Sequence, residues 1–157
     1  MKQSKPETAD AALSQVVERH RAELQRFAVW VALNRAHAED IVRAAISSVR
    51  DAGGRCDDTA LVRIELFAAA VREHLRRVQL GRKPIVDLLE CAPGEDVHIE
   101  GLRRAVLTLQ DEYRLPLLMQ VLGGFSATQI SMELNLTTAV VHGRLLRARE
   151  HLKLSAS

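Results

Sequence analysis

Apolar residues recur every three or four positions along most of the chain, a spacing that places them on one face of an α-helix. The pattern predicts a long helix after Asp10, a second from about Ala38 to Arg50 that Gly53-Gly54 ends, and a third after Asp58, an N-cap candidate. The apolar positions of the three helices are Leu13, Val16, Val17, Leu24, Phe27 and Val31, then Ile41, Val42, Ala45, Ile46 and Val49, then Leu61, Ile64, Ala68, Val71, Leu75 and Val78. We expect these helices to pack as an N-terminal domain over residues 10–79.

A break in this rhythm divides the chain into two parts. Between Gly81 and Glu100, Pro84, Pro93 and Gly94 interrupt the pattern and acidic residues are in excess. This composition is typical of a linker, which we place at residues 80–100 with room for one helical turn.

A second domain is expected at residues 101–154. It should open with apolar Leu102, Val106 and Leu109, followed by a helix from about Leu115 to Gly123-Gly124. Pro116 would be tolerated at the start of that helix, where a backbone N–H has no helical partner. No strand pattern competes. The predicted fold class is therefore all-α, with two small helical domains joined by a linker, an N-terminal helical bundle and a C-terminal helix-turn-helix domain.

The segment Phe125 to Lys153, FSATQISMELNLTTAVVHGRLLRAREHLK, predicts the helix-turn-helix. Ser126 and Gln129 have the spacing of a capping box, which begins a short helix with Ile130 and Leu134 on its apolar side. Asn135 tolerates the left-handed conformation that ends a helix. A tight turn then leads to a second helix.

The second helix should have an apolar face and a basic face. Thr137 or Thr138 is its N-cap candidate. Its predicted core positions are Val141, Leu145, Ala148 and Leu152. The opposite side should present Thr138, Ala139, His142, Leu146, Arg149 and Lys153, with Arg144 and Arg147 on the flanks.

Such a helix commonly lies in the major groove of DNA, with its first residues at base edges and its basic residues at phosphates. We therefore predict that Thr138, Ala139 and His142 read bases. The predicted phosphate contacts are Arg144, Arg147, Arg149 and Lys153. The alternative is a solvated helix with a charged face, because helix-turn-helix geometry also occurs without DNA binding.

Charge supports a local interface only. The net charge of the 157 residues is +2, so affinity for nucleic acid must come from clustering. Residues 101–157 contain seven Lys or Arg against four Asp or Glu, whereas residues 78–100 contain two against five. The charge thus changes sign between the linker and the C-terminal domain.

Other classes of function have little support. Cys56 and Cys91 are isolated, so neither a metal site nor a redox motif is expected. The six histidines are scattered, with no nucleophile motif or glycine-rich phosphate loop, so we expect neither enzyme activity nor a cofactor. The polar N-terminus lacks the apolar core of a signal peptide, and no apolar run reaches membrane-spanning length. A cytoplasmic protein without membrane insertion is expected.

Over most of its length the chain resembles the extracytoplasmic-function (ECF) group of bacterial RNA polymerase sigma factors. Five stretches of the C-terminal part resemble the promoter-reading motif of that family. They are Phe125-Ser126, Gln129-Ile130-Ser131, Leu134-Asn135-Leu136, Val141 and Arg144-Leu145-Leu146-Arg147-Ala148-Arg149. Leu109 with Arg114 resembles the entry to that domain. Ala38-Glu39-Asp40-Ile41-Val42 resembles the start of the helix that docks on the polymerase clamp.

The resemblance implies a protein without catalytic residues that selects promoters for transcription initiation. The N-terminal helices would bind core RNA polymerase and the downstream promoter element, with Glu39, Asp40 and Arg43 as the polymerase-binding candidates. The C-terminal helix-turn-helix would read the upstream element of promoter DNA. An anti-sigma factor is the expected regulatory partner.

The chain also departs from the family pattern. Arg43 and Ala44 stand where the family usually has Gln and Glu, and Val62 and Ile64 stand near aromatic positions that capture unstacked bases. Phe67 is the one aromatic residue of the third helix, and packing is its expected role. These departures leave a second hypothesis open, a sigma-factor mimic that binds an anti-sigma factor in a partner switch without binding DNA.

Overall fold

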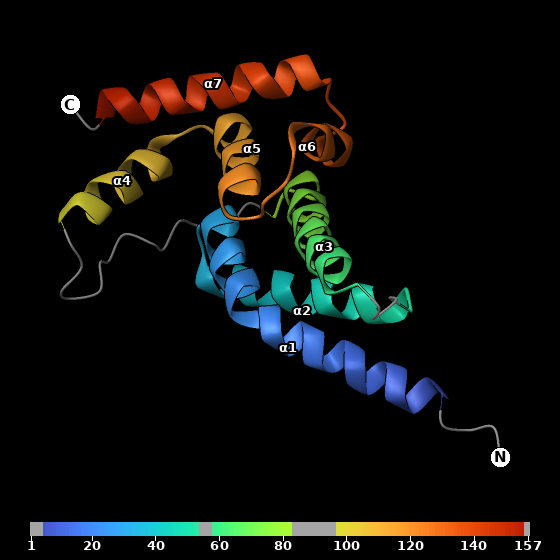
Figure 1. The fold of residues 1–157 in the computed structure, drawn as a ribbon. Helices are drawn as coiled ribbons and strands as arrows, with labels where there is room; N and C mark the ends of the chain where they lie inside the picture. The colour runs from blue at the N-terminus through green and yellow to red at the C-terminus, as the bar shows by residue number, and fades with distance from the viewer. Residues whose placement is uncertain (1–4, 54–57, 83–96, 156–157) are drawn as a thin grey trace. The chain divides into compact units, whose positions relative to one another are not determined.

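The computed structural model describes residues 5–53, 58–82 and 97–155, and every regular element within these ranges is an α-helix (Figure 1). The chain forms two compact units, Met1–Pro84 and Ile85–Ser157. The all-α fold class with two helical units is thus confirmed. Cys56, Cys91 and most of the expected linker lie outside the described residues. None of the described helices is both long enough and apolar enough to cross a lipid bilayer.

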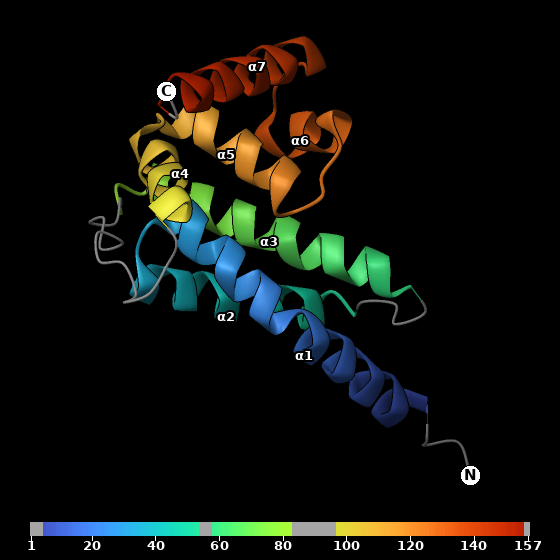
Figure 2. The same cartoon turned by 60° about the vertical axis from the view of Figure 1, so that its left-hand side comes forward.

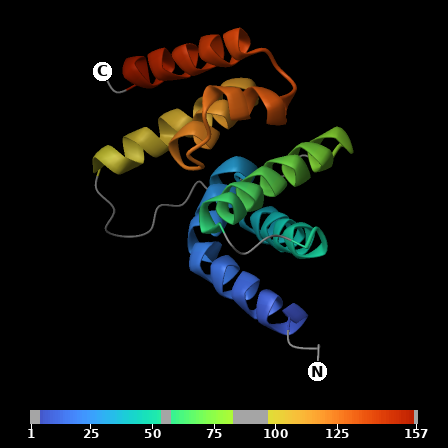
Figure 3. The same cartoon turned by 45° about the vertical axis from the view of Figure 1, so that its right-hand side comes forward.

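The N-terminal unit consists of three helices that contact one another: α1 at Lys5–Ala32, α2 at Arg35–Asp51 and α3 at Thr59–Gln79. Figure 3 shows them in blue, teal and green, with α3 running over α2. All apolar positions predicted for α1 and α2 are buried. In this core the rings of Phe27 and Phe67 lie 4.9 Å apart between centroids, a favourable distance for an aromatic pair.

Side-chain caps set where α2 and α3 begin. The Asp58 carboxylate accepts hydrogen bonds from the backbone N–H groups of Ala60 and Leu61, as predicted for an N-cap. α2 begins at Arg35, three residues before the predicted start, because the Asn34 side chain accepts a hydrogen bond from the backbone N–H of His37. The apolar pattern could not reveal this polar first turn.

The predicted apolar stripe of α3 is partly wrong. Ala68 and Val71 are buried as predicted, but Leu61 in the first turn is 61% exposed. The other predicted positions are only half-buried: Ile64, Leu75 and Val78. The additional buried residues are Val62, Leu66, Phe67, Ala69, Ala70 and His74. Because α3 contacts both α1 and α2, it buries a wider arc than the single stripe of a surface helix.

The C-terminal unit has four helices. They are α4 at Val97–Thr108, α5 at Asp111–Val121, α6 at Ala127–Leu134 and α7 at Thr138–Ser155. α7 contacts each of the other three, and Figures 1 and 2 show it lying along one side of them. α4 begins at Val97, within the last residues of the expected linker. Val106 and Leu109 are buried, while the Leu102 side chain lies outside the described part.

The start of α5 corrects the sequence prediction. The helix begins at Asp111 rather than near Leu115, so Pro116 lies inside it. The first turn is stabilised by the buried Arg114, whose guanidinium donates hydrogen bonds to the Leu109 carbonyl oxygen and to the Asp111 carboxylate. These bonds extend the helix ahead of Pro116. Inside the helix the proline nitrogen cannot donate a backbone hydrogen bond, and its ring crowds the carbonyl group of Glu112 one turn earlier.

Candidate nucleic-acid interface

The turn between α6 and α7 has the predicted geometry. The Ser126 hydroxyl accepts a hydrogen bond from the Gln129 backbone N–H over 3.1 Å, and the Gln129 side chain accepts one from the Ser126 backbone N–H over 2.8 Å. The capping box is therefore confirmed. Asn135 has a φ of 53°, in the left-handed region, and ends α6 as predicted. The capping box thus sets the start of α6, and Asn135 sets its end.

One face of α7 packs on the rest of its unit. Thr137 caps the helix, because its hydroxyl accepts a hydrogen bond from the Val140 backbone N–H over 3.3 Å. Three predicted core residues are buried: Val141, Leu145 and Ala148. The fourth, Leu152, is half-buried near the helix end. The predicted orientation of α7 is therefore confirmed.

The outward side of α7 carries the three predicted base-reading residues. Thr138, Ala139 and His142 are all exposed in the first turns of the helix. Leu146 follows one turn after His142 and is 57% exposed. Small and polar side chains at an exposed helix start suit contact with base edges, and the nearby apolar side chain of Leu146 suits contact with thymine methyl groups. The base-reading roles themselves stay predictions.

The four predicted phosphate-binding cations differ in their surroundings. Arg144 is paired with Glu112 of α5 over 3.7 Å, and Arg149 donates a hydrogen bond to the Gln120 side chain of α5. Arg147 is exposed and makes no ion pair within the described part of the chain. Lys153 is exposed in the last turn, where a cation also suits the helix dipole.

These contacts change one detail of the predicted face. Arg149 was expected on the outward side and Arg147 on a flank. The hydrogen bond to Gln120 instead places Arg149 at the edge of the side that packs on α5, and Arg147 points outward. Helix spacing is consistent with this, because at 3.6 residues per turn Arg147 lies farther from the buried face than Arg149 does. Only the hydrogen bond to Gln120 needed the structure.

The structure also reveals a shallow groove beside the C-terminal half of α7. Arg147 and His151 of α7 line it together with Tyr113 of α5. The His151 ring nitrogen Nε2 lies 3.3 Å from the Thr108 hydroxyl at the end of α4. These residues are far apart in sequence and carry no joint motif, so the groove was not predictable.

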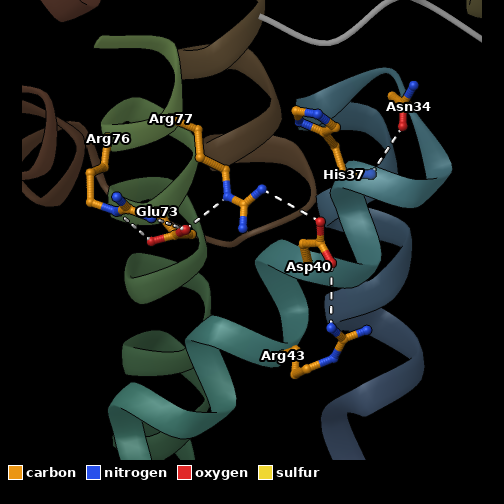
Figure 4. Close-up of polar contacts among 7 residues, drawn as sticks. All are labelled: Asn34, His37, Asp40, Arg43, Glu73, Arg76 and Arg77. Atoms are coloured by element: carbon orange, nitrogen blue, oxygen red, sulfur yellow. Dashed lines mark hydrogen bonds and ion pairs between the residues drawn. The ribbon is translucent and has the colours of Figure 1, made fainter. Parts of the chain in front are cut away.

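The polymerase-binding candidates lie on α2, and Figure 4 shows two of them, Asp40 and Arg43. The Asp40 carboxylate lies 3.4 Å from Arg43 and 3.5 Å from Arg77 of α3. Glu39 and Arg43 are exposed, and both line a groove between α1 and α2. The structure thus brings the three candidates to one region of the N-terminal unit, with Asp40 partly committed to holding α3. Their role in polymerase binding stays a prediction.

Arg77 also takes part in an ion-pair cluster around Glu73, one turn before it on α3. The Glu73 carboxylate accepts hydrogen bonds from Arg76 and from Arg77 over 2.7 to 2.9 Å (Figure 4). The hydrogen bonds from Arg76, together with the one from Arg77, hold the pKa of Glu73 below its usual value, although burial opposes the shift. Arg77 therefore joins Glu73 of α3 to Asp40 of α2.

Phe67 has the packing role expected from its sequence position. The side chain is fully buried, and the Arg63 guanidinium lies over its ring at 4.4 Å from the centroid. A ring in this position is not available to stack on a base of a separated DNA strand.

Comparisons with known proteins identify the C-terminal unit. Residues 99–152 match the family model for sigma-70, region 4, and this match includes the whole helix-turn-helix. None of the curated protein sequences compared with the chain matches it significantly.

A solved structure extends the likeness to both units. It contains the sigma factor RpoE from Bartonella quintana in complex with the anti-sigma factor NepR, and the chain matches RpoE with a TM-score of 0.59 and 18% identity. The match covers 93% of this chain and 94% of RpoE. At this identity the likeness concerns the fold. Residues 99–152 thus match sigma-70, region 4, and the chain as a whole shares the fold of RpoE.

Proposed function

We propose that the chain is an ECF sigma factor that directs core RNA polymerase to specific promoters. The observation that carries the proposal is the outward side of α7, where Thr138, His142 and Arg147 are exposed within the region 4 match. Polar groups at the start of the helix suit base edges, and cations further along suit phosphates. A solvated helix without a partner would need no such order of side chains.

The two units would divide the work. The N-terminal unit would bind core polymerase and the downstream promoter element, with Glu39, Asp40 and Arg43 on the polymerase side. The C-terminal unit would read the upstream element. The protein would act in the cytoplasm, and the reaction itself would belong to the polymerase, so the chain needs neither catalytic residues nor a cofactor.

Regulation by an anti-sigma factor is part of the proposal. It is supported by the shared fold with RpoE, which was crystallised with the anti-sigma factor NepR. An anti-sigma factor would block one or both units and keep the sigma factor from polymerase until a signal arrives.

A sigma-factor mimic is the second candidate function. The burial of Phe67 favours it, because α3 then lacks its one aromatic side chain as a base-capturing group. A mimic would share the fold and bind an anti-sigma factor, but it would neither bind core polymerase nor read DNA. The exposed cation Arg147 favours the sigma factor over this mimic.

The experiment that separates the two functions uses the purified full chain and bacterial core RNA polymerase. A sigma factor should co-elute with core enzyme in gel filtration and support transcripts from genomic fragments that core enzyme alone does not transcribe. Failure of both, combined with tight binding to an anti-sigma protein, would support the mimic.

Matched variants locate the polymerase surface in the same assay. Arg43→Glu reverses the charge of a polymerase-binding candidate that is largely exposed, so the fold should be kept. Co-elution with core enzyme should weaken. Arg19→Glu, on an exposed position of α1, is the control and should co-elute as the wild type does. Equal co-elution of both variants would remove Arg43 from the polymerase surface.

A further inference from the structure

Gly143 lies in the middle of the outward side of α7. With about 3.6 residues per turn, its position on the helix is opposite the centre of the buried face formed by Val141, Leu145 and Ala148. Ala139 precedes it by one turn, and Arg147 follows by one turn. Gly143 is thus at the centre of the surface that would face DNA.

The fold gives no reason for glycine at this position. A Cβ atom added to Gly143 would meet no atom within 4 Å, and the residue is not among those with positive φ. Gly123 provides the contrast, since a Cβ there would lie 2.6 Å from the Phe125 ring and 2.7 Å from the Met119 carbonyl oxygen. Glycine inside a helix is less favourable than alanine by about 1 kcal/mol. Gly143 therefore lowers the stability of α7 without a packing benefit.

We propose that Gly143 is the point where the backbone of α7 comes closest to promoter DNA, and that its missing side chain sets how deeply α7 enters the major groove. Glycine permits close approach of the backbone to a ligand. The small Ala139 one turn before it extends the same low surface, which lets His142 reach base edges. The exposed Arg147 marks where the approach ends and phosphate contact begins. This inference rests on the proposed function, because it requires α7 to bind DNA.

The proposal predicts that stability and DNA affinity change in opposite directions at this one residue. Replacement by alanine or glutamine restores helix propensity and should stabilise the C-terminal unit. The same replacements add atoms at the point of closest approach and should weaken DNA binding. A glycine with no role at an interface would give the first effect without the second.

The test uses the wild-type chain bound to core polymerase to enrich duplexes from a randomised DNA pool. The enriched duplex is the probe for Gly143→Ala and Gly143→Gln, each as full chain with core polymerase. We expect affinity to fall about tenfold for alanine, comparable to one lost base contact, and further for glutamine. Urea denaturation of the same variants should show midpoints at or above that of the wild type.

Gly101 of α4 supplies the matched control. It is also exposed inside a helix, and a Cβ there would likewise meet no atom within 4 Å. Gly101→Ala and Gly101→Gln should stabilise the unit while leaving affinity for the probe unchanged.

The outcomes separate this inference from the function on which it rests. A wild-type holoenzyme that enriches no sequence would refute the proposed function and the role of Gly143 with it. Wild-type enrichment combined with unchanged affinity of Gly143→Gln would refute the role of Gly143 alone. An equal loss of affinity in the Gly101 variants would do the same, because the effect would then not be specific to α7.

Discussion

Arg114 donates a hydrogen bond from Nη1 to the carbonyl oxygen of Leu109 over 3.0 Å, and so connects α5 to the residue that follows α4. The guanidinium also lies 2.5 Å from the Asp111 carboxylate, and the Arg114 side chain is buried. Arg114 thus links α5 to the end of α4, and α7 packs against both of these helices. Its contribution to the fold of the C-terminal unit can be measured directly.

Replacement of Arg114 by methionine should destabilise the C-terminal unit by about 1.5–3 kcal/mol, the range for hydrogen bonds to charged groups. The loss leaves the Leu109 carbonyl without its guanidinium donor. Hydrogen exchange of the α4, α5 and α7 amides would measure it. Arg147→Met, which changes an exposed arginine of the same unit, should alter stability by less than about 0.5 kcal/mol. Similar effects of both changes would contradict the anchoring role of Arg114.

Two adjacent leucines of α7 test the orientation of the helix. Leu145→Asp should unfold the C-terminal unit, because it buries an unpaired carboxylate in a position that is only 2% exposed. Leu146→Asp should keep the unit folded, since that side chain already faces solvent. Circular dichroism and urea denaturation would compare them. A folded Leu145→Asp protein would show that the buried face of α7 is assigned wrongly.

Arg147 should contribute one phosphate contact when the chain binds promoter DNA. Arg147→Ala should reduce the slope of log affinity against log salt concentration by about 0.9 and weaken binding to all sequences alike. The measurement is a salt titration of the holoenzyme on two unrelated duplexes. Arg19→Ala, at an exposed position of α1, is the control and should leave the slope unchanged. A change in sequence preference with no change in slope would instead assign Arg147 to base reading.

The Glu73 cluster should make the stability of the N-terminal unit depend on acid pH. Hydrogen bonds from Arg76 and Arg77 lower the folded-state pKa of Glu73 below 4.5. A lowered pKa contributes stability that is fully present above the unfolded-state value and disappears as pH falls through the folded-state value. Glu73→Gln should therefore be less stable than the wild type at pH 7.

The pH dependence of this difference is the decisive measurement. Urea denaturation of wild type and Glu73→Gln should give midpoints that converge as pH falls below about 4.5, because the wild-type carboxylate becomes protonated. Arg72→Gln, which removes an exposed ion pair with Glu65 on the same helix, should show a smaller difference at pH 7. A difference that stays constant down to the acid range would exclude the ionised form of Glu73 as its source.

Local signals in the sequence predicted well the two helices that carry the candidate interface. The Ser126 capping box, the left-handed Asn135 and the apolar spacing of α7 each depend on residues within a few positions of one another. Such signals involve few distant residues, so the residue types are enough to predict them, although packing is still needed to stabilise a helix as short as α6. The missed glycine had a signal too, because Gly143 stands inside a helix where alanine would be more stable.

The errors had two sources, one in a local hydrogen-bond arrangement and one in the packing between helices. Pro116 was assigned to a helix start, but the buried guanidinium of Arg114 begins α5 earlier. Leu61 was assigned to the core, yet α3 packs on α1 and α2 with other residues and leaves Leu61 exposed. Helix periodicity predicts which residues lie on the same side of a helix, but it does not predict how many other helices pack against that helix.

The sequence by itself determined the all-α class, the capped turn before α7, and the side of α7 that packs inward, because these follow from hydrogen bonds and apolar spacing within one or two turns. Only the tertiary structure decided that Arg149 bonds to Gln120 and that Arg77 joins Asp40 to Glu73. A long charged side chain can reach several partners. The partner it contacts depends on which groups the packing of the helices brings within a few ångströms of it.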